Sequence, residues 1–207
     1  MITKLYNGNP NTREVRRVAD MLRAGGVVIL PTDTLYAFCC SMEHKKAAEQ
    51  IAQLKGFSLK QARYSMLCAS LSQASEYYRA IDRDRFAMLK ACLPGPYTFI
   101  MEAAGSVPRN FQNANHTIGI RVPDNDITRA IIDEVGTPLI STSVRPIDGD
   151  DEVENYTDPE LIHDHFGHRV EVVVDGGLAD PTPSTVVDCS DGIVLVRQGK
   201  GEWIDEN

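Results

Sequence analysis

The sequence has no long hydrophobic run and no cysteines at metal-binding spacing. Its apolar stretches fall short of the roughly 18 residues of a membrane-spanning helix, and the amino-terminal MITKLYNGNPNTREV lacks the hydrophobic region of a signal peptide. We therefore expect neither membrane insertion nor export. The cysteines are odd in number and lack C-x-x-C spacing, which argues against a disulfide framework or a zinc ribbon and fits a reducing cytoplasm. They are Cys39, Cys40, Cys68, Cys92 and Cys189.

Positive charge is scarce as well. The formal net charge of −8 argues against indiscriminate binding to nucleic acid, which depends on neutralising phosphates, but it leaves a local basic groove open. The acidic excess is partly concentrated in DGDDEVEN, residues 148–155, which we interpret as a solvated loop, with regulation or metal binding as alternatives. No repeat, low-complexity tract or linker divides the chain.

Helical and strand patterns alternate along the whole sequence. Of its 207 residues 43% are hydrophobic, enough for one sizeable core, so we predict a single domain over residues 1–207. Apolar residues at helical spacing predict helices over residues 11–24, 43–55, 84–93 and 127–135, and a last helix capped by Thr157 or Asp158. Apolar segments predict strands over residues 27–30, 66–69, 97–101, 117–122, 138–142, 170–174, 184–188 and 193–197. This interleaving predicts an α/β fold, with a mixed sheet because some strands are joined too briefly for a crossover helix.

Polar residues collect where predicted strands end. PTDT (31–34) follows the first strand, Thr117 and Arg121 flank an apolar IGI, and three further groups lie at residues 141–143, 183–185 and 197. Ligands of open α/β sheets usually bind beyond strand ends, and these hydroxyl and guanidinium groups suit a phosphorylated or carboxylate ligand. Each piece also has a structural interpretation: the hydroxyls as turn or cap residues, Arg121 in an ion pair, and Lys55 as the complement of a helix dipole.

Seven segments then carry a family resemblance. GGVVILPTDTLYAFCC, LPGPYTFIM, TIGIRVP, PLISTS, DGG, PSTVVD and VLVRQG occur in this order over about residues 12–200, and together they closely resemble the YrdC/YciO family. The resemblance implies a YrdC/RibB-like twisted sheet covered by helices, with a large concave basic cavity. It also implies a cytoplasmic enzyme that combines L-threonine, bicarbonate and ATP, assisted by Mg²⁺, into threonylcarbamoyl-AMP for modification of tRNA adenosine 37. Some members are described as binding double-stranded RNA or tRNA.

The resemblance also implies roles for individual residues. Those matching the L-threonine site are Thr32, Arg121, Ser141 and Ser184, and those along ATP are Lys55, Thr117, Ser143, Arg145 and Arg197. Lys55 and Arg121 would be the catalytic pair, through alignment and charge stabilisation, because the reaction needs no protein nucleophile. Asp33 would accept a hydrogen bond either from the substrate amine or from backbone amides of its own turn.

Two departures separate this chain from the synthase branch of the family. That branch carries Lys-x-Arg, usually followed by Pro, after the second helix; here Lys55 is kept, but Phe57 and Ser58 occupy the other two places. It also carries Ser-x-Asn, where this chain has Ser143 and Arg145. Both differences resemble the YciO branch. Lys60 or Arg63 are candidates to supply the lost charge.

Two hypotheses about function follow. The first is a synthase of low activity; the second is a nucleotide- or RNA-binding protein of the YciO type that keeps the cavity without the efficient reaction. A basic rim for RNA would come from Lys45, Lys46, Lys60, Arg63 and Arg145. The sequence does not indicate the oligomeric state.

Other polar features receive structural interpretations. His163, His165 and His168 are spaced so that all three do not share one helix face, and we predict no metal site there. Cys39 and Cys40 lie in an apolar strand and are expected to be buried thiols. Trp203 lies beyond the last strand, where it would dock the tail.

Overall fold

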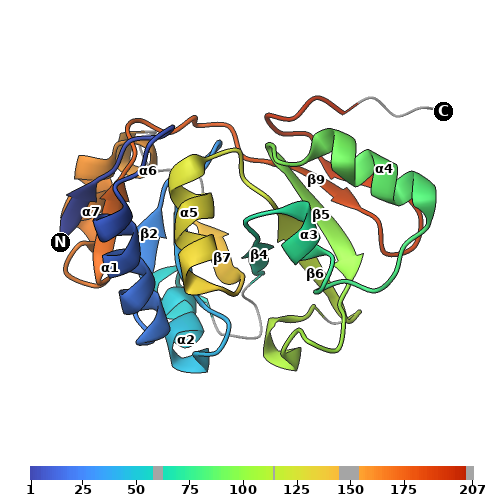
Figure 1. Cartoon of the computed structure of the whole chain (residues 1–207), viewed down its shortest axis with the longest axis horizontal. Coiled ribbons are helices and arrows are strands. Elements are labelled where there is room, and N and C mark those ends of the chain that lie inside the picture. The colour runs from blue at the N-terminus through green and yellow to red at the C-terminus, as the bar shows by residue number, and fades with distance from the viewer. Residues whose placement is uncertain (58–62, 114, 145–153, 204–207) are drawn as a thin grey trace.

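A computed structural model describes residues 1–57, 63–113, 115–144 and 154–203 as one mixed α/β domain (Figure 1). The helices are α1 (Thr12–Arg23), α2 (Lys45–Leu54), α3 (Leu71–Ala74), α4 (Arg83–Cys92), α5 (Asp126–Val135), α6 (Glu154–Thr157) and α7 (Pro159–Phe166), with a 3-10 turn η1 at Arg109–Phe111. The strands are β1 (Ile2–Lys4), β2 (Val28–Leu30), β3 (Ala37–Ser41), β4 (Ser65–Leu67), β5 (Tyr97–Glu102), β6 (Thr117–Arg121), β7 (Leu139–Ser143), β8 (Val172–Asp175), β9 (Thr185–Asp188) and β10 (Val194–Arg197).

All ten strands form one sheet in the order β1-β8-β2-β3-β7-β4-β6-β5-β9-β10. Four neighbouring pairs are parallel, namely β1/β8, β2/β8, β4/β6 and β5/β9. The other pairs are antiparallel. The prediction of a mixed sheet covered by helices is therefore confirmed.

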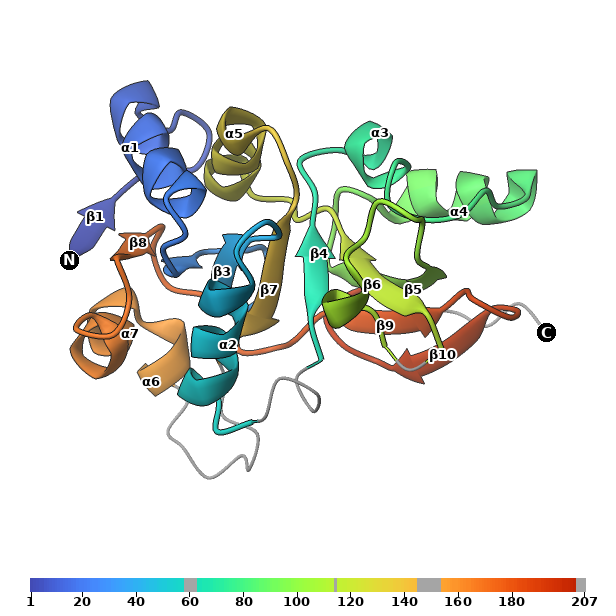
Figure 2. The same ribbon diagram turned by 90° about the horizontal axis from the view of Figure 1, so that it is seen from below.

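Alternation along the strands divides the core into two clusters. In β2, Val28 and Leu30 contact the α1 and α5 side of the sheet, whereas Ile29 belongs to the cluster that includes residues of α2 and α7. Figure 2 shows these two pairs of helices on opposite sides of the strands. Because β2 is buried on both sides, its apolar run is continuous rather than alternating.

Helix ends follow the capping signals of the sequence. The side chain of Asn11 accepts hydrogen bonds from the amides of Arg13 and Glu14 and begins α1. Asp158 caps α7, which has Pro159 in its first turn. These side chains satisfy amide groups that a helix leaves without intrahelical partners, and one of the two caps proposed for α7 is confirmed.

Short elements were harder to predict. No sequence pattern predicted β1, α3 or α6, because three or four residues are too few to establish a period. The predicted strand 170–174 is displaced: β8 begins at Val172, since the amide of Glu171 hydrogen-bonds to the carbonyl of Val27 ahead of the regular ladder.

The described residues also bear on the other structural expectations. Within the described ranges, no helix is long and apolar enough to span a membrane. Cys39 and Cys40 are fully buried, as predicted. Trp203 packs against Phe99 with ring centroids 6.4 Å apart, so it does dock the tail. The same part of the chain contains no group of three His, Cys, Asp or Glu side chains able to hold a metal.

Candidate functional site

The turn after β2 meets the end of β6. Nη2 of Arg121 donates to the hydroxyl of Thr32 at 3.1 Å, to that of Thr34 at 2.8 Å and to the carboxylate of Asp33. The Thr32 hydroxyl in turn donates to the carbonyl of Leu35 at 2.6 Å. The structural interpretation of Arg121 as half of an ion pair is thus correct, and its partner belongs to the predicted site itself.

This ion pair is buried and incompletely satisfied. The side chains of Arg121 and Asp33 are each 10% exposed. Among the described residues, neither Nε of Arg121 nor Oδ2 of Asp33 has a hydrogen-bond partner. Buried polar groups are normally paired, because leaving one unpaired costs about 1–3 kcal/mol. One unused donor and one unused acceptor within the same ion pair are the groups that a ligand carrying both a carboxylate and an ammonium could satisfy.

Polar residues continue from Arg121 across the centre of the sheet. Ser65 lies opposite both Gly119 and Ser141 in the strand register, and the Ser141 hydroxyl donates to the Ser65 carbonyl at 3.1 Å. A Cβ on Gly119 would lie 3.0 Å from the Ser65 hydroxyl and 3.1 Å from the methyl of Thr98. We call this side of β7, β4, β6 and β5 the polar face. The sequence predicted Ser141 and Arg121 here but gave no separate signal for Ser65, Thr98 or Gly119.

Ser184, the residue before β9, joins the polar face. Its hydroxyl is 2.8 Å from the hydroxyl of Thr98. Its carbonyl accepts from Nη2 of Arg197 at 2.8 Å and from Nε at 3.2 Å. The structure therefore brings Ser184 and Arg197 together, and it brings Thr32 and Arg121 together.

Lys55 approaches the site from the end of α2. Its ammonium donates to the carbonyl of Ser143 at 2.9 Å. Burial lowers the pKa of Lys55 to about 8. Lys55 and Ser143, both assigned to the ATP site from the family resemblance, are thus adjacent, and the hydrogen bond shows that Lys55 does more than complement the helix dipole.

Thr117 begins β6, four residues before Arg121. That spacing corresponds to about 13 Å along a strand. The Thr117 hydroxyl accepts from the side-chain amide of Asn113 at 3.2 Å. The polar face therefore extends along β6 from Arg121 to Thr117, as an elongated ligand would require.

Several predicted residues fall elsewhere. Ser58, Lys60, Arg145 and most of the acidic 148–155 segment lie outside the described residues. Arg63 is exposed, and Phe57, in place of the family's arginine, is half-buried with its amide bonded to the carbonyl of Ala52.

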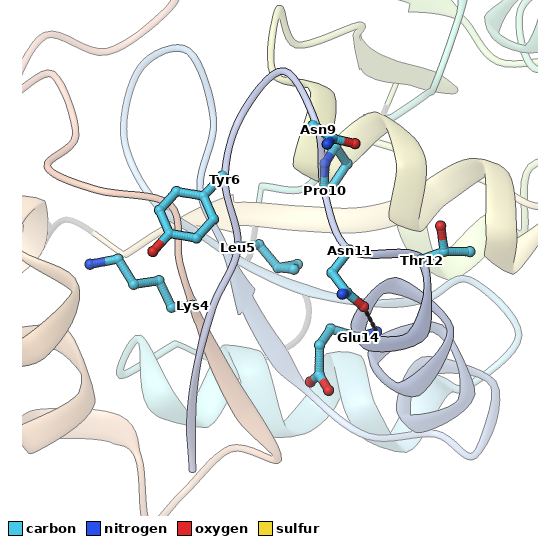
Figure 3. Close-up of a pocket in the computed structure, with 8 residues that line it drawn as sticks. All are labelled: Lys4, Leu5, Tyr6, Asn9, Pro10, Asn11, Thr12 and Glu14. Carbon is cyan, nitrogen blue, oxygen red and sulfur yellow. Dashed lines mark hydrogen bonds between the residues drawn. The ribbon is translucent and has the colours of Figure 1, made fainter.

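The two hollows found among the described residues do not coincide with the polar face. One of about 530 Å³ lies between the segment after β1 and the start of α1, lined by residues such as Tyr6 and Asn11 (Figure 3). The other, of about 550 Å³, is lined by residues such as Tyr78 and Phe86. The large basic cavity over the polar face stays a prediction.

This combination defines an α/β protein with a group of polar side chains at and between its central strands, which is the candidate ligand site. Comparison with known proteins gives the family: the Sua5/YciO/YrdC model, described as telomere recombination, matches residues 20–199, and the chain belongs to this family. The site turn 31–34 and the β6, β7 and β9 residues all lie within the matched region.

Three relatives place the chain within the family. It is 35% identical to the uncharacterized protein YciO of Escherichia coli K12, over 96% of this chain and 95% of YciO. The crystal structure of E. coli YciO superposes with a TM-score of 0.88 at 33% identity, covering 98% and 97% of the two chains. A threonylcarbamoyl-AMP synthase of Halorhodospira halophila is 30% identical, over 84% of this chain and 91% of the synthase. The structure of P. abyssi Sua5 complexed with L-threonine shares the fold, with a TM-score of 0.83 at 23% identity over 96% of this chain and 57% of that chain.

Proposed function

We propose that the protein binds L-threonine at the Arg121–Asp33 pair and joins it with bicarbonate and ATP to form threonylcarbamoyl-AMP. The observation that carries this proposal is the unused donor on Arg121 beside the unused acceptor on Asp33. An α-amino acid would offer its carboxylate to the guanidinium and its ammonium to the carboxylate. The hydroxyls of Thr32, Ser141 and Ser184 line the same region and would contact the rest of the amino acid.

The relatives support this choice of ligand. The H. halophila relative bears the name threonylcarbamoyl-AMP synthase, and the P. abyssi Sua5 structure is a complex with L-threonine. A product of this kind would be used in tRNA modification. Since YciO of E. coli, at 35% identity, is an uncharacterized protein, the rate of product formation is the quantity to measure.

In this mechanism the chain aligns reactants and stabilises charge. The threonine ammonium first loses a proton to solvent, and its nitrogen then bonds to the carbon of bicarbonate as a C–OH bond breaks and water leaves. An oxygen of the resulting carbamate attacks the α-phosphorus of ATP as pyrophosphate leaves. Lys55 and Arg197 would neutralise the phosphates, with Thr117 and Ser143 farther along the ATP. Arg145 is proposed for the same role on the basis of sequence alone.

Mg²⁺ fits this scheme as a companion of the triphosphate. It usually binds through substrate phosphates, one or two carboxylates and water. The described residues contain no three-ligand cluster that would hold it independently of ATP. When bound, it would supply charge neutralisation at the phosphates, and we assign it no protein ligand.

The proposal is tested by product formation. The purified protein is incubated with ATP, Mg²⁺, bicarbonate and labelled L-threonine, and threonylcarbamoyl-AMP is sought by mass-resolved chromatography. Arg121→Lys keeps the charge but loses the planar fork, so it should lower product formation at least tenfold. Lys90→Ala, which removes an exposed ammonium in the last turn of α4, is the matched control and should leave the rate unchanged.

A second candidate is a nucleotide- or RNA-binding protein without efficient synthesis. Phe57 favours it, since an apolar, half-buried ring stands where synthases carry a guanidinium. Loss of one donor to a developing negative charge typically costs about 3 kcal/mol of transition-state stabilisation. Absence of product together with ATP binding in calorimetry would favour this second candidate.

A further inference from the structure

The segment after β10 contacts the 31–34 turn of the candidate site through the side chain of Lys200. The ammonium of Lys200 donates to the backbone carbonyl of Asp33 at 2.8 Å. It also lies 3.0 Å from the carboxylate of Asp180. Lys200 thus links three stretches of chain far apart in sequence: the 31–34 turn, the segment before β9 and its own.

The backbone on both sides of Lys200 is fixed. The amide of Lys200 donates to the carbonyl of Pro183 at 2.9 Å, and the amide of Gly199 donates to the hydroxyl of Thr185 at 2.9 Å. A Cβ on Gly199 would come within 2.3 Å of the Pro183 carbonyl oxygen. Since only glycine fits this close approach, the segment is built to lie directly on residues 183–185, which include Ser184.

Hydrogen bonds favour the ionised form of the Asp180 carboxylate, which pairs with the ammonium of Lys200. The amide of Thr182 donates to its carboxylate at 2.8 Å, and that bond, with the one from Lys200, lowers the pKa of Asp180. In Figure 1 the chain between β8 and β9, which contains Asp180, crosses from the left half of the molecule to the right along its upper edge. Asp180 therefore holds Lys200 on the segment that joins the two halves.

We call the 31–34 turn and residues 183–185 the two walls of the candidate site, and they come from distant parts of the sheet. Strands β2 and β9 are six positions apart in the sheet order, which in a flat sheet would separate them by about 29 Å. Twist and the length of the 31–34 turn bring Thr32 and Ser184 to the same region. Lys200 contacts the Asp33 carbonyl on one wall and, through its amide, the Pro183 carbonyl on the other.

We infer that Lys200 is a positioning residue: it fixes the 31–34 turn against the wall that carries Ser184 and so sets the affinity of the Arg121–Asp33 pair for an α-amino acid. The part about affinity rests on the proposed function. The hydrogen bond from Lys200 fixes the backbone carbonyl of Asp33. Loss of that bond would free the backbone and displace the Asp33 carboxylate from Arg121.

The first experiment needs no ligand. Hydrogen exchange is followed in the peptide covering residues 31–37 of the whole chain, for wild type, Lys200→Met, Lys200→Arg and Asp180→Asn. Faster exchange is expected in Lys200→Met, with wild-type rates largely restored in Lys200→Arg and an intermediate rate in Asp180→Asn. Unchanged exchange in Lys200→Met would overturn the inference. Lys45→Met, which removes an ammonium outside the contact between Lys200 and the 31–34 turn, should exchange like wild type.

The second experiment measures L-threonine affinity by calorimetry. Lys200→Met should weaken it about tenfold, the low end for loss of a charge-assisted hydrogen bond. The added change Asp180→Asn should cost little more, because both residues act through one link. Unchanged affinity in Lys200→Met, with wild type binding, would overturn the inference. If wild type binds no L-threonine while exchange still rises in Lys200→Met, the proposed function fails and the positioning role is upheld.

Discussion

At the scale of single residues, the ion pair of Arg121 and Asp33 is both the centre of the site and a burden on stability. Both side chains are 10% exposed, and desolvation of charges is only partly offset when donors and acceptors remain unused. Replacing the pair by apolar groups would remove that cost and also the proposed site for L-threonine. We interpret the pair as retained for binding rather than for stability.

Removing one member of the pair should therefore be more damaging than removing both. Arg121→Met leaves the Asp33 carboxylate buried without its partner and should lower the free energy of unfolding by about 3 kcal/mol. Arg121→Met combined with Asp33→Asn should recover at least half of that loss. Urea unfolding measures both. Arg79→Met, which breaks an exposed pair with Glu102, is the control and should change stability by less than about 0.5 kcal/mol.

The depressed pKa of Lys55 gives the site a pH dependence. Below about pH 8 Lys55 carries the charge that would meet a phosphate, and above it that charge is lost. ATP affinity of the wild type should therefore fall as pH rises through this value, with a bound phosphate moving the midpoint upward. Calorimetry from pH 7 to pH 10 tests this, and Lys55→Met should bind ATP weakly with little pH dependence. Equal slopes in both proteins would contradict the role of Lys55.

Lys55 also affects stability in a defined direction. Burial lowers its pKa from the ordinary 10.5 to about 8, so between these values the unfolded chain binds more protons than the folded one. The free energy of unfolding should then rise with pH across this window through Lys55. Lys55→Met should remove that part of the slope in urea unfolding, whereas Lys45→Met should keep it.

At the scale of elements, β6 supplies the polar face through its alternation. Thr117, Gly119 and Arg121 share one side, while Ile118 and Ile120 are buried on the other. Gly119 keeps the polar face open, because a methyl there would contact Ser65 and Thr98 at 3.0–3.1 Å. The strand thus combines a core side with a ligand side.

Gly119→Ala should weaken L-threonine binding while changing the stability of the fold only slightly. The added methyl lies between two side chains that need to move by only a few tenths of an ångström, so the free energy of unfolding should change by less than about 1.5 kcal/mol. L-Threonine affinity should fall at least fivefold, because the methyl covers part of the polar face. Gly105→Ala, with nothing within 4 Å of its Cβ, is the control. Full affinity in Gly119→Ala would place the ligand elsewhere.

Elements with their own local signals could be predicted from the sequence, and contacts between distant segments could not. Asn11 begins α1 because its side chain bonds to the next amides, which is a property of a few adjacent residues. The pairing of Arg121 with the 31–34 turn followed from family motifs, but its partner Asp33 and the role of Lys200 did not. Both contacts join segments that are distant in the sheet order, since β2 and β6 are four positions apart and Lys200 lies beyond β10, and no local pattern encodes how such segments approach each other.

At the scale of the whole molecule, the sheet ends in two edges of different character. At β1 the edge carries Lys4, 62% exposed at its side chain, and a charge of this kind discourages pairing with another chain. At β10 the side chains of Ile193, Val194 and Val196 are 47–57% exposed. Arg197, the charged residue of that edge, turns back to the Ser184 carbonyl. Of the two edges, β10 is therefore the one at which we expect a second copy of the chain to associate.

Charges placed on β10 should reduce aggregation on heating without affecting the fold. Val194→Lys with Val196→Lys should change the free energy of unfolding by less than about 1 kcal/mol, because both side chains are more than half exposed. Light scattering on heating should begin at a higher temperature, since two ammonium groups repel a second copy at the free edge. Ile2→Lys on β1 should have the smaller effect, because Lys4 already protects that edge. Equal effects at the two edges would show that added net charge, rather than the β10 edge, controls association.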